Sequence, residues 1–123
     1  MDTLMPSLLI VDDSVNVRDR LKQMVEESFS DTVIEMAGSY KEAVEKISFM
    51  NPSVIFLDLN LPDRNGFDIL NLINEKGIIT RVIIITNNAG SQYRKNAFKL
   101  GAKAFIDKSN EFESITGVLK EIL

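Results

Sequence analysis

The stretch VIFLDLNLPDRNG, residues 54–66, determines how the rest of the chain is interpreted. Its first four residues are apolar without a break, which is typical of a strand buried on both faces of a parallel sheet. A lone aspartate, Asp58, closes this run, and residues 61–66 supply the proline, asparagine and glycine of a loop. The stretch therefore predicts a central strand that ends in one carboxylate.

Further apolar runs lie on both sides of this stretch, at residues 8–11, 33–37, 82–85 and 104–106. The segments that follow the runs repeat apolar residues with the period of a helix, as Leu21 and Val25 do in the first of them. Strict alternation of strands and helices predicts an α/β sandwich. Its parallel sheet should have right-handed crossovers, with helices on both faces.

Capping residues indicate where some of these helices begin. Ser39 with Glu42, and Asn110 with Glu113, have the spacing of a capping box. Either residue of the Asp-Ser pair at positions 13–14 fits the N-cap of the first helix. Helices are therefore expected to start after residues 14, 39 and 110.

The composition limits the chemistry that the chain can perform. The 123 residues contain no cysteine and no histidine, which excludes disulfides, thiolate metal sites and the commonest general base. The net charge of −4 argues against a direct nucleic-acid surface. The amino-terminal residues lack the basic start and long apolar region of a signal peptide, and no stretch has the length of a membrane span. A cytoplasmic protein is expected.

Polar residues follow the apolar runs where each strand is expected to end. These residues are Asp12, Asp13, Asp58, Thr86, Asp107 and Lys108. The carboxyl ends of parallel strands share one edge of the sheet, and ligands bind in the crevice outside that edge. Side chains that are far apart in the sequence are therefore expected to form one site.

Converging carboxylates repel one another, and a hard divalent cation relieves that repulsion. Oxygen ligands in a chain without cysteine or histidine favour Mg²⁺ over a transition metal. An ammonium and a hydroxyl beside such an ion suit a phosphoryl group, and aspartate is a known phosphoryl acceptor. The residues alone therefore point to Mg²⁺-dependent phosphoryl chemistry.

This ordered set of residues resembles the receiver domains of two-component response regulators, the CheY-like family. The resemblance rests on Asp12, Asp13, Asp58, the loop at 61–66, Thr86, Gly101, Ala102, Phe105 and Lys108. It implies a flavodoxin-like (βα)5 three-layer sandwich, with a five-stranded parallel sheet of order 2-1-3-4-5. Residues 1–123 would then form a single receiver domain.

The resemblance also implies which residues bind the metal and accept the phosphoryl group. Asp58 would be the phosphoacceptor. Asp13, Asp58 and the backbone carbonyl of Asn60 would hold Mg²⁺, with Asp12 acting mostly through a water molecule.

Other residues would bind the phosphoryl group once it is attached. Lys108 would pair with one phosphoryl oxygen, Thr86 would donate its hydroxyl to another, and the backbone N–H of Asn87 would add a contact. Phe105 occupies the position of the switch aromatic. Ser109 stands where the family often has proline, so a trans peptide bond is expected between residues 108 and 109.

The function implied by the resemblance is a signalling switch rather than an enzyme with a separate substrate. A phosphohistidine on a sensor histidine kinase or phosphotransfer protein, or a small phosphodonor, would phosphorylate Asp58. Thr86 would then move toward the phosphoryl group and Phe105 would turn inward. The surface of the fourth helix, fifth strand and fifth helix would change shape.

That surface would contact a target protein or an attached output domain, or form a phosphorylation-dependent dimer; no membrane contact is expected. Basic residues gather in this region of an acidic chain, at Arg94, Lys95, Lys99 and Lys103. They suggest a partner with acidic character, or self-association through acids of the fifth helix. A solvated amphipathic helix is the alternative interpretation of the same residues.

Two other classes of function are compatible with such a fold. A Mg²⁺ phosphohydrolase with an aspartate nucleophile carries a second aspartate two residues later, where this chain has Asn60, and needs a cap for its substrate. A flavin-binding module needs a phosphate cradle after the first strand, where this chain has the acidic residues Asp12 and Asp13. A degenerate, purely structural receiver would be expected to lack part of the aspartate–lysine set.

Overall fold

Strands and helices alternate along the computed structural model, which describes residues 6–88 and 90–122. The strands in this part of the chain are β1 (Ser7–Val11), β2 (Val33–Ala37), β3 (Val54–Leu57), β4 (Arg81–Thr86) and β5 (Ala104–Asp107). The helices are α1 (Val15–Ser28), α2 (Tyr40–Met50), α3 (Phe67–Lys76), α4 (Ser91–Lys99) and α5 (Ile115–Ile122), with a 3-10 turn at Phe112–Ser114. None of the described helices is long and apolar enough to cross a bilayer.

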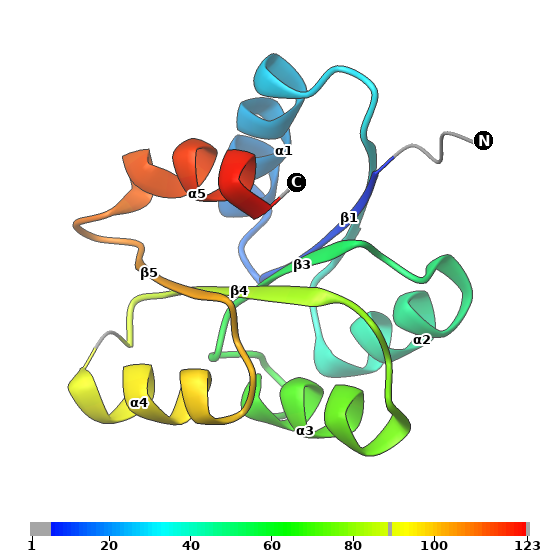
Figure 1. The fold of residues 1–123 in the computed structure, drawn as a ribbon, viewed down its shortest axis with the longest axis vertical. Coiled ribbons are helices and arrows are strands. Elements are labelled where there is room, and N and C mark those ends of the chain that lie inside the picture. Colours follow the sequence, from blue (N-terminus) through cyan, green and yellow to red (C-terminus); the bar gives the residue numbers. More distant parts are fainter. Residues whose placement is uncertain (1–5, 89, 123) are drawn as a thin grey trace.

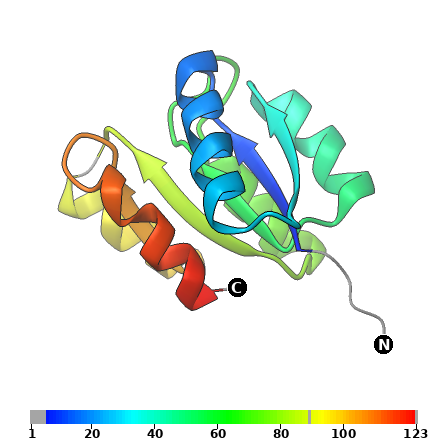
Figure 2. The same cartoon turned by 90° about the horizontal axis from the view of Figure 1, so that it is seen from above.

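The strands form one parallel sheet of order β2-β1-β3-β4-β5, which confirms the topology predicted from the sequence. Helices α1 and α5 cover one face of the sheet, and α2, α3 and α4 cover the other (Figure 1). Every strand pairing is parallel, and the arrowheads visible in Figure 2 point the same way, so the carboxyl ends of the strands share one edge.

Alternate strand residues build a hydrophobic core on each side of the sheet. In β1, Leu9 and Val11 pack with α2, α3 and α4, whereas Leu8 and Ile10 pack with α1 and α5. All four residues of β3 are buried, as its uninterrupted apolar sequence predicts. The central strands are thereby fixed from both faces, and they hold their carboxyl-terminal neighbours in place.

Two of the three predicted helix starts are confirmed. The hydroxyl of Ser14 accepts a hydrogen bond from the N–H of Val17, and that of Ser39 accepts one from Glu42. The prediction that Asn110 begins the last helix is wrong. Its side-chain amide donates to Asp107 instead, and α5 starts after the 3-10 turn.

The loop after β3 folds back onto the end of that strand. The N–H of Gly66 donates to the carbonyl of Leu59 at 2.8 Å, and Asn60 pairs with Asn65 in an isolated bridge. A Cβ at position 66 would lie 2.3 Å from the carbonyl oxygen of Asp58. Glycine is therefore required here for close approach of two backbone segments.

Candidate functional site

Three polar side chains are buried at the carboxyl edge of the sheet. Asp12 follows β1, Asp58 follows β3 and Thr86 ends β4, with only 2%, 5% and 0% of their surfaces exposed. Buried carboxylates need partners, because an unpaired charge away from water is strongly disfavoured. The sheet edge thus brings together residues from three strands, as the sequence predicted.

Lys108 supplies a partner for both buried carboxylates. Its Nζ lies 2.6 Å from Oδ2 of Asp12 and 2.9 Å from Oδ2 of Asp58, and its own side chain is 11% exposed. The lysine is positioned by its backbone, since its N–H donates to the carbonyl of Thr86 at 3.0 Å. One ammonium therefore bridges the ends of β1 and β3 from the end of β5.

Burial has opposite effects on the pKa values of Asp12 and Lys108. Burial raises the pKa of Asp12 above its ordinary value, and the hydrogen bonds from Lys108 and from the Ser14 N–H only partly oppose the rise. Burial by itself lowers the pKa of Lys108. Hydrogen bonds to Asp12 and Asp58, together with their negative charges, outweigh that effect and leave it raised. The pKa values of both groups are therefore raised for different reasons: burial raises that of Asp12, and the two carboxylates raise that of Lys108.

The remaining negative charge creates a suitable place for a cation. Carboxylate oxygens of Asp12, Asp13 and Asp58 all lie within 4.8 Å of one another, and Asp13 is the exposed member. Hard oxygen donors at this separation fit Mg²⁺. Lys108 neutralises only one of the three charges, so the donor set fits the predicted ion. The N–H of Asn60 donates to Oδ1 of Asp58 at 3.2 Å, which places the backbone of residue 60 beside the same carboxylate.

An amide pair that the sequence did not predict spans two loops next to this carboxylate. Nδ2 of Asn88 donates to Oδ1 of Asn60 at 2.8 Å, and the N–H of Asn88 donates to the hydroxyl oxygen of Thr86 at 3.1 Å. The pair joins the loop after β3 to the loop after β4. It also places an amide at residue 60, where the phosphohydrolase alternative requires an acid.

A second unpredicted contact joins the loops after β4 and β5. The hydroxyl of Ser109 donates to Oδ1 of Asn87 at 3.2 Å. Every peptide bond in the described part of the chain is trans, which confirms the expectation for the bond between Lys108 and Ser109.

Asp107 also ends a strand, but its carboxylate forms hydrogen bonds within the loop that follows β5. It accepts hydrogen bonds from the N–H of Ser109 at 2.9 Å and from Nδ2 of Asn110 at 3.0 Å. These bonds shape the loop that carries Lys108, while Asp107 itself stays outside the carboxylate cluster.

Phe105 lies in β5 with 5% of its surface exposed. The guanidinium of Arg94 covers its ring at 4.9 Å from the ring centre and also contacts Glu111 at 3.4 Å. Phe105 is therefore already buried in this conformation, and the inward turn expected on phosphorylation stays a prediction. The side chain that covers Phe105 comes from α4, and no local pattern in the sequence predicts this contact.

Comparison with known proteins agrees with this geometry. Residues 8–120 match the family described as response regulator receiver domain. The chain belongs to that family. It contains a receiver domain of two-component response regulators, and this domain has an acidic pocket at the edge of its sheet.

Individual relatives show how far the similarity extends. The sensory transduction protein LytT of Bacillus cereus is 32% identical over 95% of this chain and 47% of its own length. The chemotaxis protein CheY of Halobacterium salinarum is 28% identical over 94% of this chain and 95% of its own length. The non-phosphorylated HemR receiver domain of Leptospira biflexa superposes with a TM-score of 0.86, at 31% identity over 95% of this chain and 93% of that domain. The receiver domain spans about half the length of LytT and similar regulators, and nearly all of CheY.

Proposed function

We propose that residues 1–123 form one receiver domain that acts as a phosphorylation-activated switch, with Asp58 as its phosphoacceptor. The observation that carries this proposal is the surroundings of Asp58. Its carboxylate is buried at the end of β3 and accepts a hydrogen bond from the ammonium of Lys108 on one oxygen. It also lies close to two further carboxylates. A carboxylate with a fixed ammonium and a cation site beside it is suited to accept a phosphoryl group.

The proposed reaction transfers a phosphoryl group from a phosphohistidine. A carboxylate oxygen of Asp58 attacks phosphorus, and the new O–P bond forms as the N–P bond breaks. The departing imidazole then takes up a proton from solvent. Mg²⁺ would be held by Asp13, Asp58 and the carbonyl of Asn60, with Asp12 acting mostly through a water molecule, and it would neutralise charge on the transferred group.

Other residues would stabilise the phosphorylated state. Lys108 would exchange its contact with the carboxylate for one with a phosphoryl oxygen, and the hydroxyl of Thr86 would donate to another. The N–H of Asn87 would add a third donor. The hydroxyl oxygen of Thr86 accepts a hydrogen bond from the N–H of Asn88 at 3.1 Å, which leaves its own O–H free to donate.

The phosphodonor in this proposal is a sensor histidine kinase or phosphotransfer protein, and the domain works in the cytoplasm. It promotes its own phosphorylation and slow dephosphorylation and does not turn over a separate substrate.

The decisive experiment is intact-mass measurement after incubation with acetyl phosphate and Mg²⁺. One base-labile phosphoryl group is expected on the wild type and on the control Asp68→Asn, and none on Asp58→Asn. Labelling of Asp58→Asn at the wild-type rate would falsify the assignment.

The proposed output surface comprises α4, β5 and α5. Phe105 is already buried there, with the guanidinium of Arg94 over its ring. Movement of Thr86 would therefore change the position of Arg94, and this change would alter the exposed surface. Lys95 and Lys99 on α4 would then meet an acidic partner or an attached output domain. Charge reversal at both lysines should weaken binding to that partner, less so at high salt, and leave phosphorylation of Asp58 intact. Unchanged binding would exclude this face.

A further inference from the structure

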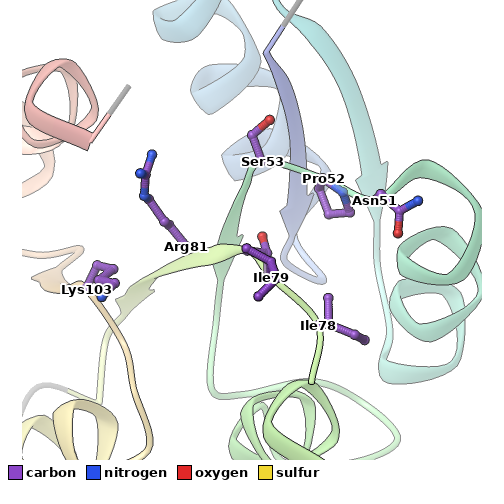
Figure 3. Close-up of a pocket in the computed structure, with 8 residues that line it drawn as sticks. Asn51, Pro52, Ser53, Ile78, Ile79, Arg81 and Lys103 are labelled. Atoms are coloured by element: carbon purple, nitrogen blue, oxygen red, sulfur yellow. The ribbon is translucent and has the colours of Figure 1, made fainter. Parts of the chain in front are cut away.

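The opposite edge of the sheet, at the amino ends of the strands, carries a groove. One hollow of about 580 Å³ lies among the loops that precede β3, β4 and β5, and its lining includes Ile79, Arg81 and Lys103 (Figure 3). A second hollow of about 470 Å³ includes Val33, Glu35 and Phe49. Both hollows are bordered by residues 51 and 53, and these two neighbouring hollows together are here called the amino-edge groove.

Large apolar side chains are left uncovered along this groove. Ile79 is 94% exposed, Phe49 is 68% exposed and Val33 is 45% exposed. Large exposed apolar side chains gathered in one region of a small domain commonly mark a place where another molecule binds. Nothing in the carboxylate site explains these residues, because they lie at the other ends of the strands.

Charged residues of opposite sign occupy the two ends of the groove. Glu35 lies on β2 at one edge of the sheet and lines the second hollow. Arg81 begins β4, and Lys103 precedes β5 at the other edge. Within the described residues neither of these cations forms a salt bridge; Arg81 donates to the carbonyl of Ile122 at 2.7 Å. Lys46 contacts Glu35 at 3.3 Å, but 46% of the Glu35 side chain remains exposed.

We propose that a second copy of this chain docks in the amino-edge groove, related to the first by a twofold axis. Val33 and Phe49 line the same hollow as Glu35, and Ile79 lines the same hollow as Arg81 and Lys103. A surface that is apolar and acidic at one end and apolar and basic at the other is complementary to itself when one copy is reversed. Glu35 of each copy then faces the cations at positions 81 and 103 of the other, and Ile79 becomes covered. The carboxylate site stays open at the far edge, so this dimer forms without phosphorylation and does not depend on the proposed function.

Sedimentation velocity over a concentration series tests the apolar part of the proposal. The wild type should show a reversible monomer–dimer equilibrium, and Ile79→Ser should weaken the dimer roughly tenfold or more, because two copies of the side chain are uncovered. Phe98→Ser is the matched control, since Phe98 is 46% exposed on α4. A monomer throughout the series, or dissociation by Phe98→Ser but not Ile79→Ser, would overturn the proposal.

A charge exchange tests the orientation of the two copies. Lys103→Glu and Glu35→Lys should each weaken the dimer, and the double variant should recover it, because each substituted charge meets its opposite across the axis. Lys95→Glu on α4 should have no effect. A double variant weaker than both single variants would refute the reversed arrangement.

Asp58→Asn should leave the dimer unchanged, and a dimer that forms only after phosphorylation would exclude this groove as its interface.

Discussion

The ammonium of Lys108 donates a 2.9 Å hydrogen bond to Oδ2 of Asp58, although the two residues are 50 positions apart in the sequence. Both side chains are almost fully withdrawn from water, at 11% and 5% exposure. In this conformation the lysine therefore holds the oxygen that we propose as part of the phosphoryl acceptor.

Replacing Lys108 with methionine should destabilise the domain in Mg²⁺-free buffer. The variant keeps the length of the side chain but leaves Asp12 and Asp58 without their cation. Loss of one partner from a buried ion pair costs about 3 kcal/mol or more of unfolding free energy. Urea unfolding should show this loss, and added Mg²⁺ should recover part of it. The exposed Lys120→Met is the control; equal stability of both variants would contradict the prediction.

Neutralising one carboxylate of the cluster should have the opposite effect. Asp58→Asn or Asp13→Asn lowers the mutual repulsion at the sheet edge, so apo stability should rise by an amount on the order of 1 kcal/mol. Mg²⁺ should stabilise the wild type by mass action and either variant far less. Thermal melts with and without Mg²⁺ measure both effects. Equal Mg²⁺ shifts in the wild type and both variants would argue against a shared cation site.

Asp63 should make stability depend on pH in the acid range. Its carboxylate accepts hydrogen bonds from the N–H groups of Lys41 at 3.0 Å and Tyr40 at 2.8 Å, at the start of α2. The Lys41 N–H is the main cause that lowers the pKa of Asp63 below its ordinary 3.8. A lowered folded-state pKa contributes stability above 3.8, which is lost as the pH falls through the folded value.

Melts of the wild type and Asp63→Asn check this prediction. The wild type should melt at the higher temperature at neutral pH, and the difference should shrink as the pH falls below the ordinary pKa of an aspartate. A difference that grows toward acid pH would show that the carboxylate is not stabilised by the start of α2.

Gly66→Ala should damage both stability and the acceptor site. The new Cβ would lie 2.3 Å from the carbonyl oxygen of Asp58 and 2.8 Å from Cα of Leu59, so backbone must move. Overpacking of this kind costs about 1–3 kcal/mol. Gly117→Ala is the control, because a Cβ there meets nothing within 4 Å in α5 and should stabilise by about 0.5–1 kcal/mol. Both melting and the rate of phosphorylation by acetyl phosphate should separate the two variants.

Short-range chemistry made most of the fold predictable from the sequence. Apolar runs located the strands to within about a residue, since burial on both faces leaves a continuous pattern. The cap at Ser39 was predictable because its partner lies three residues ahead. The convergence of Asp12 and Asp58 followed from parallel topology alone.

Contacts between loops could not be predicted in the same way. Asp63 reaching the start of α2, and Asn88 reaching Asn60, depend on the path of two loops at once. Asn110 failed as a cap because Asp107, three residues earlier, offered its amide a carboxylate. Local spacing has no information about such competition between nearby partners.

The backbone at the end of β3 has a consequence for hydrogen exchange. The N–H of Asp58 donates to the carbonyl of Val11 at 2.9 Å as part of the sheet, so its deuterium uptake should require opening of the central strands. The N–H of Asn60 instead donates to the Asp58 carboxylate itself. Two amides two positions apart would thus respond to different events: one to loss of the sheet, the other to any change in the charge or occupancy of that oxygen.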